Sequence, residues 1–319
     1  MMTYHRVLNY FKTLSPRTVK ALQGASAVIL LIAVAWFVDV GNAVTLLRQT
    51  DWRWLIPAVL MVQLQIVLSA WRWQITAARL GQEFPLRRAV SEYYLATVAN
   101  LSLPGGVAGD AARVYRNRQS GVLSVAVHSV VLERLAGQLA LFVVSVVGWL
   151  MWPLLMQTSV PEFGIRVLAI TFGLIVLIGV GILISIKFAP NWIAKAILNF
   201  GPAFRSAWWS DRQWLVQGVL SLSIVLTYAL VFSFSSYAIS APLPLPAVVS
   251  IVPLVLLSML IPISVGGWGI REAAAAVLWP LAGLSSEAGV ATSIIYALIS
   301  LVACVPGLLL LFKSRAKPM

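Results

Sequence analysis

The chain has 319 residues, of which 60% are hydrophobic and only 10% charged, and its formal net charge is +13. Soluble domains carry about a quarter charged residues, so this chain cannot cover its surface with polar groups. The composition therefore excludes a soluble enzyme, a nucleic-acid-binding domain and a disordered chain, and it indicates an integral membrane protein. One cysteine and two histidines offer no spacing for a zinc-type site, so we expect no metal and no cofactor.

Six long apolar runs predict membrane-spanning helices, because about 20 apolar residues cross the hydrocarbon core. They cover residues 21–38, 54–77, 122–155, 164–188, 215–239 and 288–312. Residues 1–20 then form a cytoplasmic N-terminal segment. Residues 190–212 mix aromatic with basic side chains, which predicts an amphipathic helix on the cytoplasmic leaflet; an ordered cytoplasmic loop is the alternative. No soluble domain remains, so residues 1–319 form a single transmembrane domain.

Two further apolar stretches are short, and each runs into a break rich in glycine and proline. Residues 89–103 end at Pro104-Gly105-Gly106, and residues 247–261 end at Pro262, four residues before Gly266-Gly267. Irregular backbone is tolerated at membrane depth only where it packs in protein or lines a polar cavity. We therefore predict an all-α polytopic fold with about six spanning helices and two opposed, broken or re-entrant hairpins; eight full crossings is the alternative.

The distribution of basic residues predicts the orientation of the chain. With the N-terminus inside, only Arg48, Arg53, Arg134, Arg166 and Arg271 fall outside the cytoplasmic segments, and Arg72 is counted within them. External loops poor in Lys and Arg satisfy the positive-inside rule. Both termini are therefore expected on the cytoplasmic side.

The two glycine-rich breaks resemble each other, since each combines proline, paired glycines, a third glycine, and an arginine and an acid before alanines. Paired interruptions of this kind point to a transporter's binding site. A helix that restarts after such a break presents free N–H groups, which bind phosphate or carboxylate. The residues assigned to headgroup binding at the breaks are Gly105, Gly106, Gly266, Gly267, Arg113 and Arg271. The alternative is that the glycines only let helices pack closely.

Glu133 and Arg134 lie about 16 Å into a predicted spanning helix, where ionisable residues are costly and normally face a partner or a cavity. We expect one central cluster, in which Glu133 and Glu272 neutralise part of the charge of three arginines, with Asp110 as a further candidate. The arginines are Arg113, Arg134 and Arg271. Arg134 is thereby a third headgroup-binding candidate, and the acids are candidates for coupling. A purely structural ion-pair network is the alternative.

At these residues the chain resembles the transmembrane, flippase-like domain of lysylphosphatidylglycerol synthases. The motifs that carry the resemblance are Leu103-Pro104-Gly105-Gly106, Gly109-Asp110, Arg113, Glu133-Arg134, Ile261-Pro262, Gly266-Gly267-Trp268-Gly269 and Arg271-Glu272. The resemblance implies a multi-pass protein of the bacterial inner membrane that is associated with moving lipids between leaflets. The 319 residues contain no aminoacyl-transfer domain, so synthase activity is not expected of them.

These observations favour a transporter that flips a lipid or a lipid-linked anionic intermediate, with an anionic phospholipid or a lipid-linked sugar as the partner. Nucleic acid is not an expected partner, whereas a second copy of the chain or an envelope-synthesis protein could be. A small-solute transporter, a membrane-embedded glycosyl or acyl transferase, and a non-transporting partner of a cell-envelope synthase are the alternatives. No evident catalytic constellation supports an enzyme.

Overall fold

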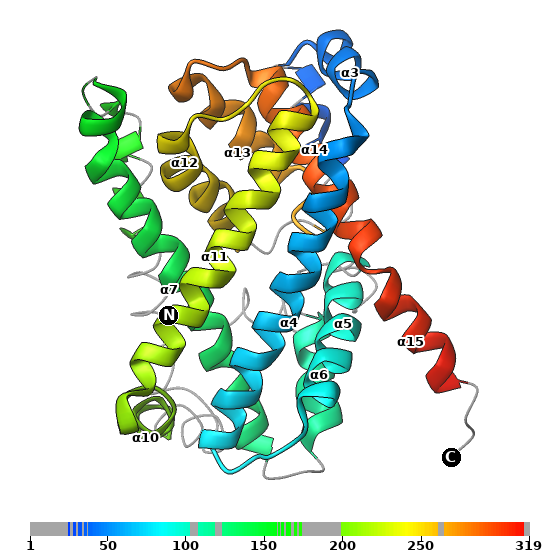
Figure 1. Cartoon of the computed structure of the whole chain (residues 1–319), viewed down its shortest axis with the longest axis vertical. Coiled ribbons are helices and arrows are strands. Elements are labelled where there is room, and N and C mark those ends of the chain that lie inside the picture. The colour runs from blue at the N-terminus through cyan, green and yellow to red at the C-terminus, as the bar shows by residue number, and fades with distance from the viewer. Residues whose placement is uncertain are drawn as a thin grey trace, which may run out of the picture.

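The computed structural model describes residues 38–102, 108–118, 123–157, 199–260 and 265–315, with isolated positions between 25 and 36 and between 159 and 173. The ordered elements among these residues are all helices, so the predicted all-α polytopic membrane fold is confirmed (Figure 1). Four expectations lie wholly or mostly outside the described residues: the spans at 21–38 and 164–188, the segment 1–20, and Gly105 with Gly106.

Four helices are long and apolar enough to cross a bilayer, and they match four of the predicted spans. They are α4 (Leu55–Arg79), α7 (Leu123–Met156), α11 (Gln213–Ala238) and α14 (Ser286–Ala303). The last predicted run was continuous to residue 312, but the helix breaks at Cys304 and restarts as α15 (Val305–Arg315). Pro306 explains the break, because proline has no N–H to continue the helix of the preceding turn.

The first hairpin consists of α5 (Leu86–Ser102) and α6 (Ala108–Asn117). Seventeen residues in α5 extend about 26 Å, which is short of the roughly 30 Å hydrocarbon core. Its two arms touch through their backbones: a Cβ at Gly109 would lie 2.0 Å from the carbonyl oxygen of Ala96. The Gly109 N–H also donates to the Asn100 side chain at 2.7 Å. The chain therefore turns back inside the molecule.

The second hairpin consists of α12 (Leu245–Ser258) and α13 (Ile270–Leu278), and it enters from the opposite end of the molecule (Figure 1). Its tip needs glycine, because Gly266 and Gly267 have φ angles of +56° and +83°. A Cβ at Gly266 would lie 2.9 Å from the carbonyl oxygen of Leu101, at the end of α5. The tip of the second hairpin therefore meets the end of α5 inside the protein.

The two hairpins belong to two similar units of opposite direction. In the first unit α4 is followed by the α5–α6 hairpin and then by α7, and in the second α11 is followed by the α12–α13 hairpin and then by α14. Figure 1 shows each helix of the second unit running opposite to its counterpart in the first. This inverted repeat gives a structural basis to the resemblance between the two breaks, and such repeats place transporter sites at their interface.

Close backbone packing joins the two units. Gly148 of α7 lies against α12, where an added Cβ would be 2.7 Å from the carbonyl of Val249. The Ser145 hydroxyl donates to the backbone carbonyl of Ser250 at 2.8 Å. Large buried side chains, including Trp73 on α4 and Phe232 on α11, fill the centre. Small residues at helix contacts are the usual packing solution in membranes, where lipid supplies no hydrophobic drive for association.

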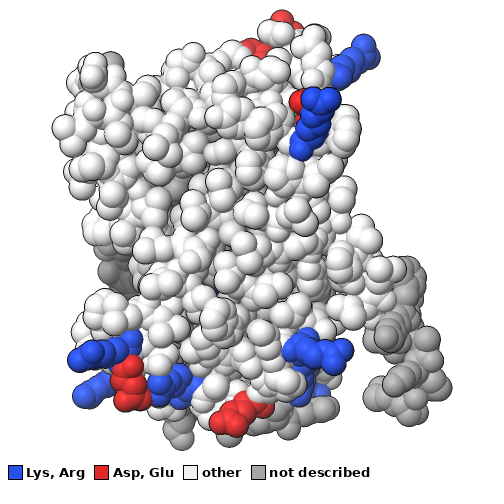
Figure 2. Space-filling model, in the orientation of Figure 1, with Lys and Arg blue, Asp and Glu red and all other residues white. Residues whose placement is uncertain are grey.

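Charged side chains lie at the two ends of the molecule on the face shown in Figure 2, and the band between them is uncharged. The helices α4 and α6 both finish at one of these ends, which we call the basic end. Its basic residues include Arg79, Arg88, Arg116 and Arg212. The opposite end carries α3 (Val40–Arg48) and the short helices η1 (Trp52–Trp54) and η5 (Trp279–Ala282).

The described part of the expected amphipathic segment, from residue 199, is helical at the basic end. It comprises α10 (Phe200–Phe204), the π-helical turn η3 (Arg205–Trp209) and η4 (Ser210–Arg212). Ala203 and Ala207 pack against Leu132 of α7, whereas Trp209 is exposed. This arrangement has one buried and one exposed face. Its location on the cytoplasmic leaflet stays a prediction.

Candidate functional site

Glu133 of α7 is the centre of a buried ionic network. Its carboxylate accepts hydrogen bonds from Arg72 of α4 at 2.7 Å, from Arg113 of α6 at 3.3 Å and from the Tyr93 hydroxyl of α5 at 3.1 Å. The side chain is fully buried. Four helices of the first unit therefore meet at one carboxylate. Its three hydrogen-bond donors offset the cost of removing this charge from water.

A second carboxylate extends the network. Asp110 of α6 pairs with Arg113 at 2.9 Å and with Arg134 of α7 at 2.8 Å. We define the arginine cluster as Arg72, Asp110, Arg113, Glu133 and Arg134. Three arginines and two carboxylates leave it with an excess of one positive charge. An uncompensated charge at membrane depth is costly, so this excess favours the binding of an anion.

Arg113 is a structural centre of the cluster rather than an open site. Its guanidinium lies between the rings of Trp73 and Tyr93, 4.6 and 4.7 Å from their centroids. The residue is fully buried. Cation–π contacts of a desolvated arginine are worth about 2 kcal/mol each. Arg113 therefore holds the first hairpin against α4. Its contact with a headgroup stays a prediction, and in this conformation its side chain is not exposed.

Arg134 is the accessible arginine of the cluster. Its side chain is 39% exposed, compared with 4% for Arg72 and 0% for Arg113. It pairs with one carboxylate, and its Nε is buried with no hydrogen-bond partner within the described residues. Arginine offers five donors in a planar fork that suits phosphate. Because its buried Nε faces no opening, it is the 39% exposure of the side chain that sets Arg134 apart as the arginine of the cluster that an anion could reach.

Arg72 is buried inside the molecule, whereas we expected it among the cytoplasmic residues. It is 3% exposed, two turns inside the end of α4 at Arg79, and its second partner is the Ser221 hydroxyl of α11 at 2.9 Å. The signal for this position was in the sequence: residue 72 lies within the apolar run 54–77. An arginine inside a span normally faces a partner or a cavity, although the sequence does not say which partner.

The predicted charges of the second hairpin form a separate group. Arg271 pairs with the adjacent Glu272 at 2.6 Å and donates to the Ser293 hydroxyl of α14 at 2.8 Å. Glu272 also accepts from Ser293 and from the backbone N–H of Gly269, so it caps α13. The group is neutral and buried. The single central cluster that we expected is wrong, because no ion pair between the described residues joins this group to the arginine cluster.

The glycines of the second break form the hairpin tip and have no contact with the arginine cluster that the structure records. A Cβ at Gly267 would lie 2.4 Å from the end of the Met259 side chain, and Gly266 faces Leu101. This geometry gives both glycines a packing role. Whether they also contact a substrate stays a prediction. Among the described residues, no group of three or more His, Cys, Asp or Glu side chains could hold a metal ion.

Comparison with known proteins agrees with the motifs. The family model described as the lysylphosphatidylglycerol synthase TM region matches residues 23–307. Neither the search of curated proteins nor that of solved structures gave a significant match. The family match spans both hairpins, the arginine cluster and all four long helices. The chain therefore belongs to the lysylphosphatidylglycerol synthase TM region family, as the sequence motifs predicted.

Proposed function

We propose that this protein moves an anionic lipid, or an anionic lipid-linked intermediate, between the leaflets of the membrane, and that Arg134 contacts the phosphate of its headgroup. The observation that carries the proposal is the excess positive charge of the buried arginine cluster together with the 39% exposure of the Arg134 side chain. A cluster that only held helices together would gain nothing from an excess of one positive charge, because charge that is not fully balanced costs free energy in a low-dielectric environment.

The architecture supports transport rather than catalysis. Two opposed hairpins that meet inside an inverted repeat provide two halves that can alternate in access, as in other transporters with broken helices. Family membership supports a role in lipid or envelope chemistry. The proposal also places the basic end on the cytoplasmic side of the inner membrane, because the positive-inside rule favours that orientation.

The test is lipid exchange in vesicles that contain the purified full-length chain and a fluorescent phosphatidylglycerol, with a membrane-impermeant quencher to report the exposed leaflet. Wild-type protein should make nearly all of the probe accessible. Arg134→Gln should slow exchange by about tenfold or more, since a charge-assisted hydrogen bond contributes about 1.5–3 kcal/mol.

The matched control is Arg166→Gln. This change also removes one positive charge, but Arg166 forms an exposed pair with Glu162, four residues before it, and exposed pairs contribute little. Exchange should therefore stay at the wild-type rate. Wild-type protein that exchanges no anionic lipid would refute the proposed function. Equal rates for wild type and Arg134→Gln would refute the role of that arginine.

A further inference from the structure

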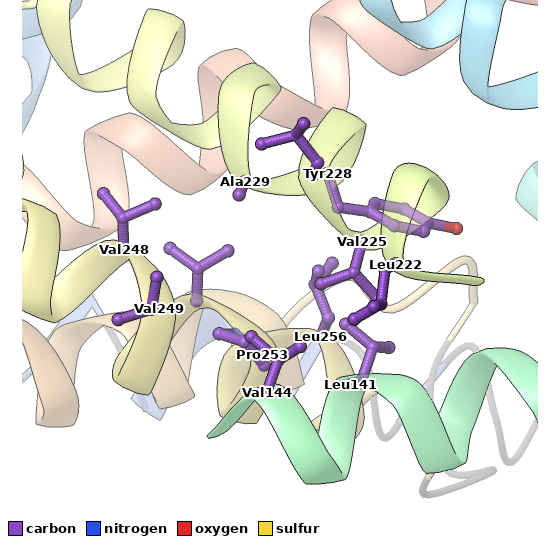
Figure 3. A pocket seen from close by; sticks show the side chains of 12 residues that line it. Leu141, Val144, Leu222, Val225, Tyr228, Ala229, Val248, Val249, Pro253 and Leu256 are labelled. Carbon is purple, nitrogen blue, oxygen red and sulfur yellow. The ribbon is translucent and has the colours of Figure 1, made fainter. Parts of the chain in front are cut away.

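An apolar pocket lies between α7, α11 and α12, outside the arginine cluster. Its volume is about 160 Å³, and eleven of its twelve lining residues have hydrocarbon side chains, among them Leu141, Val144, Val225 and Val252. The exception is Tyr228. Figure 3 shows side chains of all three helices converging on this space. A dry apolar cavity of about 150 Å³ accepts a benzene-sized molecule, so this pocket has room for about six carbons.

The pocket opens sideways, toward lipid. Leu222 and Leu226 line it and are also 54% and 58% exposed on the outer surface of α11. Both lie within α11, which is long and apolar enough to cross the hydrocarbon core of a bilayer. A polar solute would find neither water nor a hydrogen-bond partner at such an opening, whereas a hydrocarbon chain could enter from the bilayer without leaving an apolar environment.

Two features connect this pocket with the arginine cluster. Leu141 follows Arg134 by seven residues, which places both on one face of α7 about 10 Å apart. Tyr228 lines the pocket, and its phenol is close enough to Arg134, Arg72 and Glu133 to interact with their charges. In Figure 3 its hydroxyl points away from the apolar end, in the direction in which α7 runs from Val144 back to Leu141. That direction leads toward Arg134.

We infer that the pocket holds a segment of one acyl chain of the transported anionic lipid while the phosphate of the same molecule contacts Arg134. This inference rests on the proposed function, and it names the occupant that both halves of the site require. The charged half lacks one negative charge, the apolar half is open to lipid, and the two lie on one helix face. A lipid with an anionic headgroup satisfies both, and a free phosphate satisfies only the first.

Photo-cross-linking tests the inference by binding alone. The probe is a phosphatidylglycerol with a diazirine near the start of one acyl chain, in phosphatidylcholine vesicles that contain the full-length chain. After illumination, labelled peptides should map to residues 222–229 and 248–256. The same diazirine on phosphatidylcholine should label these peptides several-fold less, and Arg134→Gln should reduce labelling by the anionic probe to that level.

Filling the pocket should abolish labelling. Leu222→Trp places a large ring at the lateral opening, and Val249→Phe fills the pocket from α12 as a second, independent variant. The matched control is Val219→Trp, because Val219 is on the same helix, is 62% exposed and does not line the pocket. It should keep wild-type labelling. Monodisperse elution of each variant shows that it is folded.

Equal labelling by the two lipid probes, which would indicate ordinary surrounding lipid, would overturn the inference, and so would full labelling in both filled variants. Exchange that depends on Arg134 without labelling in the pocket would also overturn it and leave the proposed function intact. Specific labelling without any exchange by the wild type would instead support the binding pocket and refute transport. The two claims therefore fail separately.

Discussion

Glu133→Gln tests the energetic role of the arginine cluster. The change keeps the shape of the side chain but removes the negative charge that faces Arg72 and Arg113, 2.7 and 3.3 Å away. The cluster then has an excess of two positive charges in place of one. Removing one partner of a buried pair costs about 3–5 kcal/mol, because the other charge is left uncompensated. We expect the free energy of unfolding to fall by about that amount.

The assay is unfolding of purified protein in mixed micelles with increasing denaturing detergent, followed by tryptophan fluorescence. Glu162→Gln is the control, since its exposed pair with Arg166 is worth at most about 1 kcal/mol. The double variant Glu133→Gln with Arg72→Gln returns the cluster to an excess of one charge and should recover part of the loss. A Glu133→Gln variant as stable as the control would refute the reasoning.

Two further predictions concern packing and orientation. Gly109→Ala should strongly destabilise the fold, because its Cβ would lie 2.0 Å from a backbone carbonyl of α5 that cannot move aside. The control is Gly218→Ala, where nothing lies within 4 Å of the added Cβ, and it should be neutral or stabilising by up to about 1 kcal/mol. Thermal unfolding of the two variants measures the difference. Arg212→Cys should react with a membrane-impermeant thiol reagent only from inside the cell and Arg53→Cys only from outside, and the opposite pattern would reverse the orientation; the chain's own cysteine is buried and gives little background.

The spans could be predicted from sequence because crossing a bilayer is a local requirement. A run of about 20 apolar residues satisfies it without reference to the rest of the chain, and this is why α4, α7, α11 and α14 were found. The hairpins could be predicted for a related reason. Residues 89–103 and 247–261 are too short to cross and end in residues that cannot continue a helix.

The partners within the site could not be predicted, because they depend on how the helices pack. Arg72 and Glu133 are 61 residues apart, and no spacing rule joins them. Arg271 and Glu272 were expected to share a cluster with Glu133, but capping of α13 by Glu272 turns this carboxylate toward its own helix start. Ser293, which completes this neutral group, carried no signal, since serine is common in membrane helices.

The inverted repeat is symmetric in its helices and asymmetric in its charge. One half carries the arginine cluster with its surplus cation, and the other carries the neutral group around Arg271. A phosphate that passed from the first half to the second would therefore move from a positively charged site to a neutral one. Under the proposed transport, the two halves would therefore differ in their attraction for a phosphate headgroup, and the close contact between Gly266 and Leu101 lies where the two hairpins approach each other.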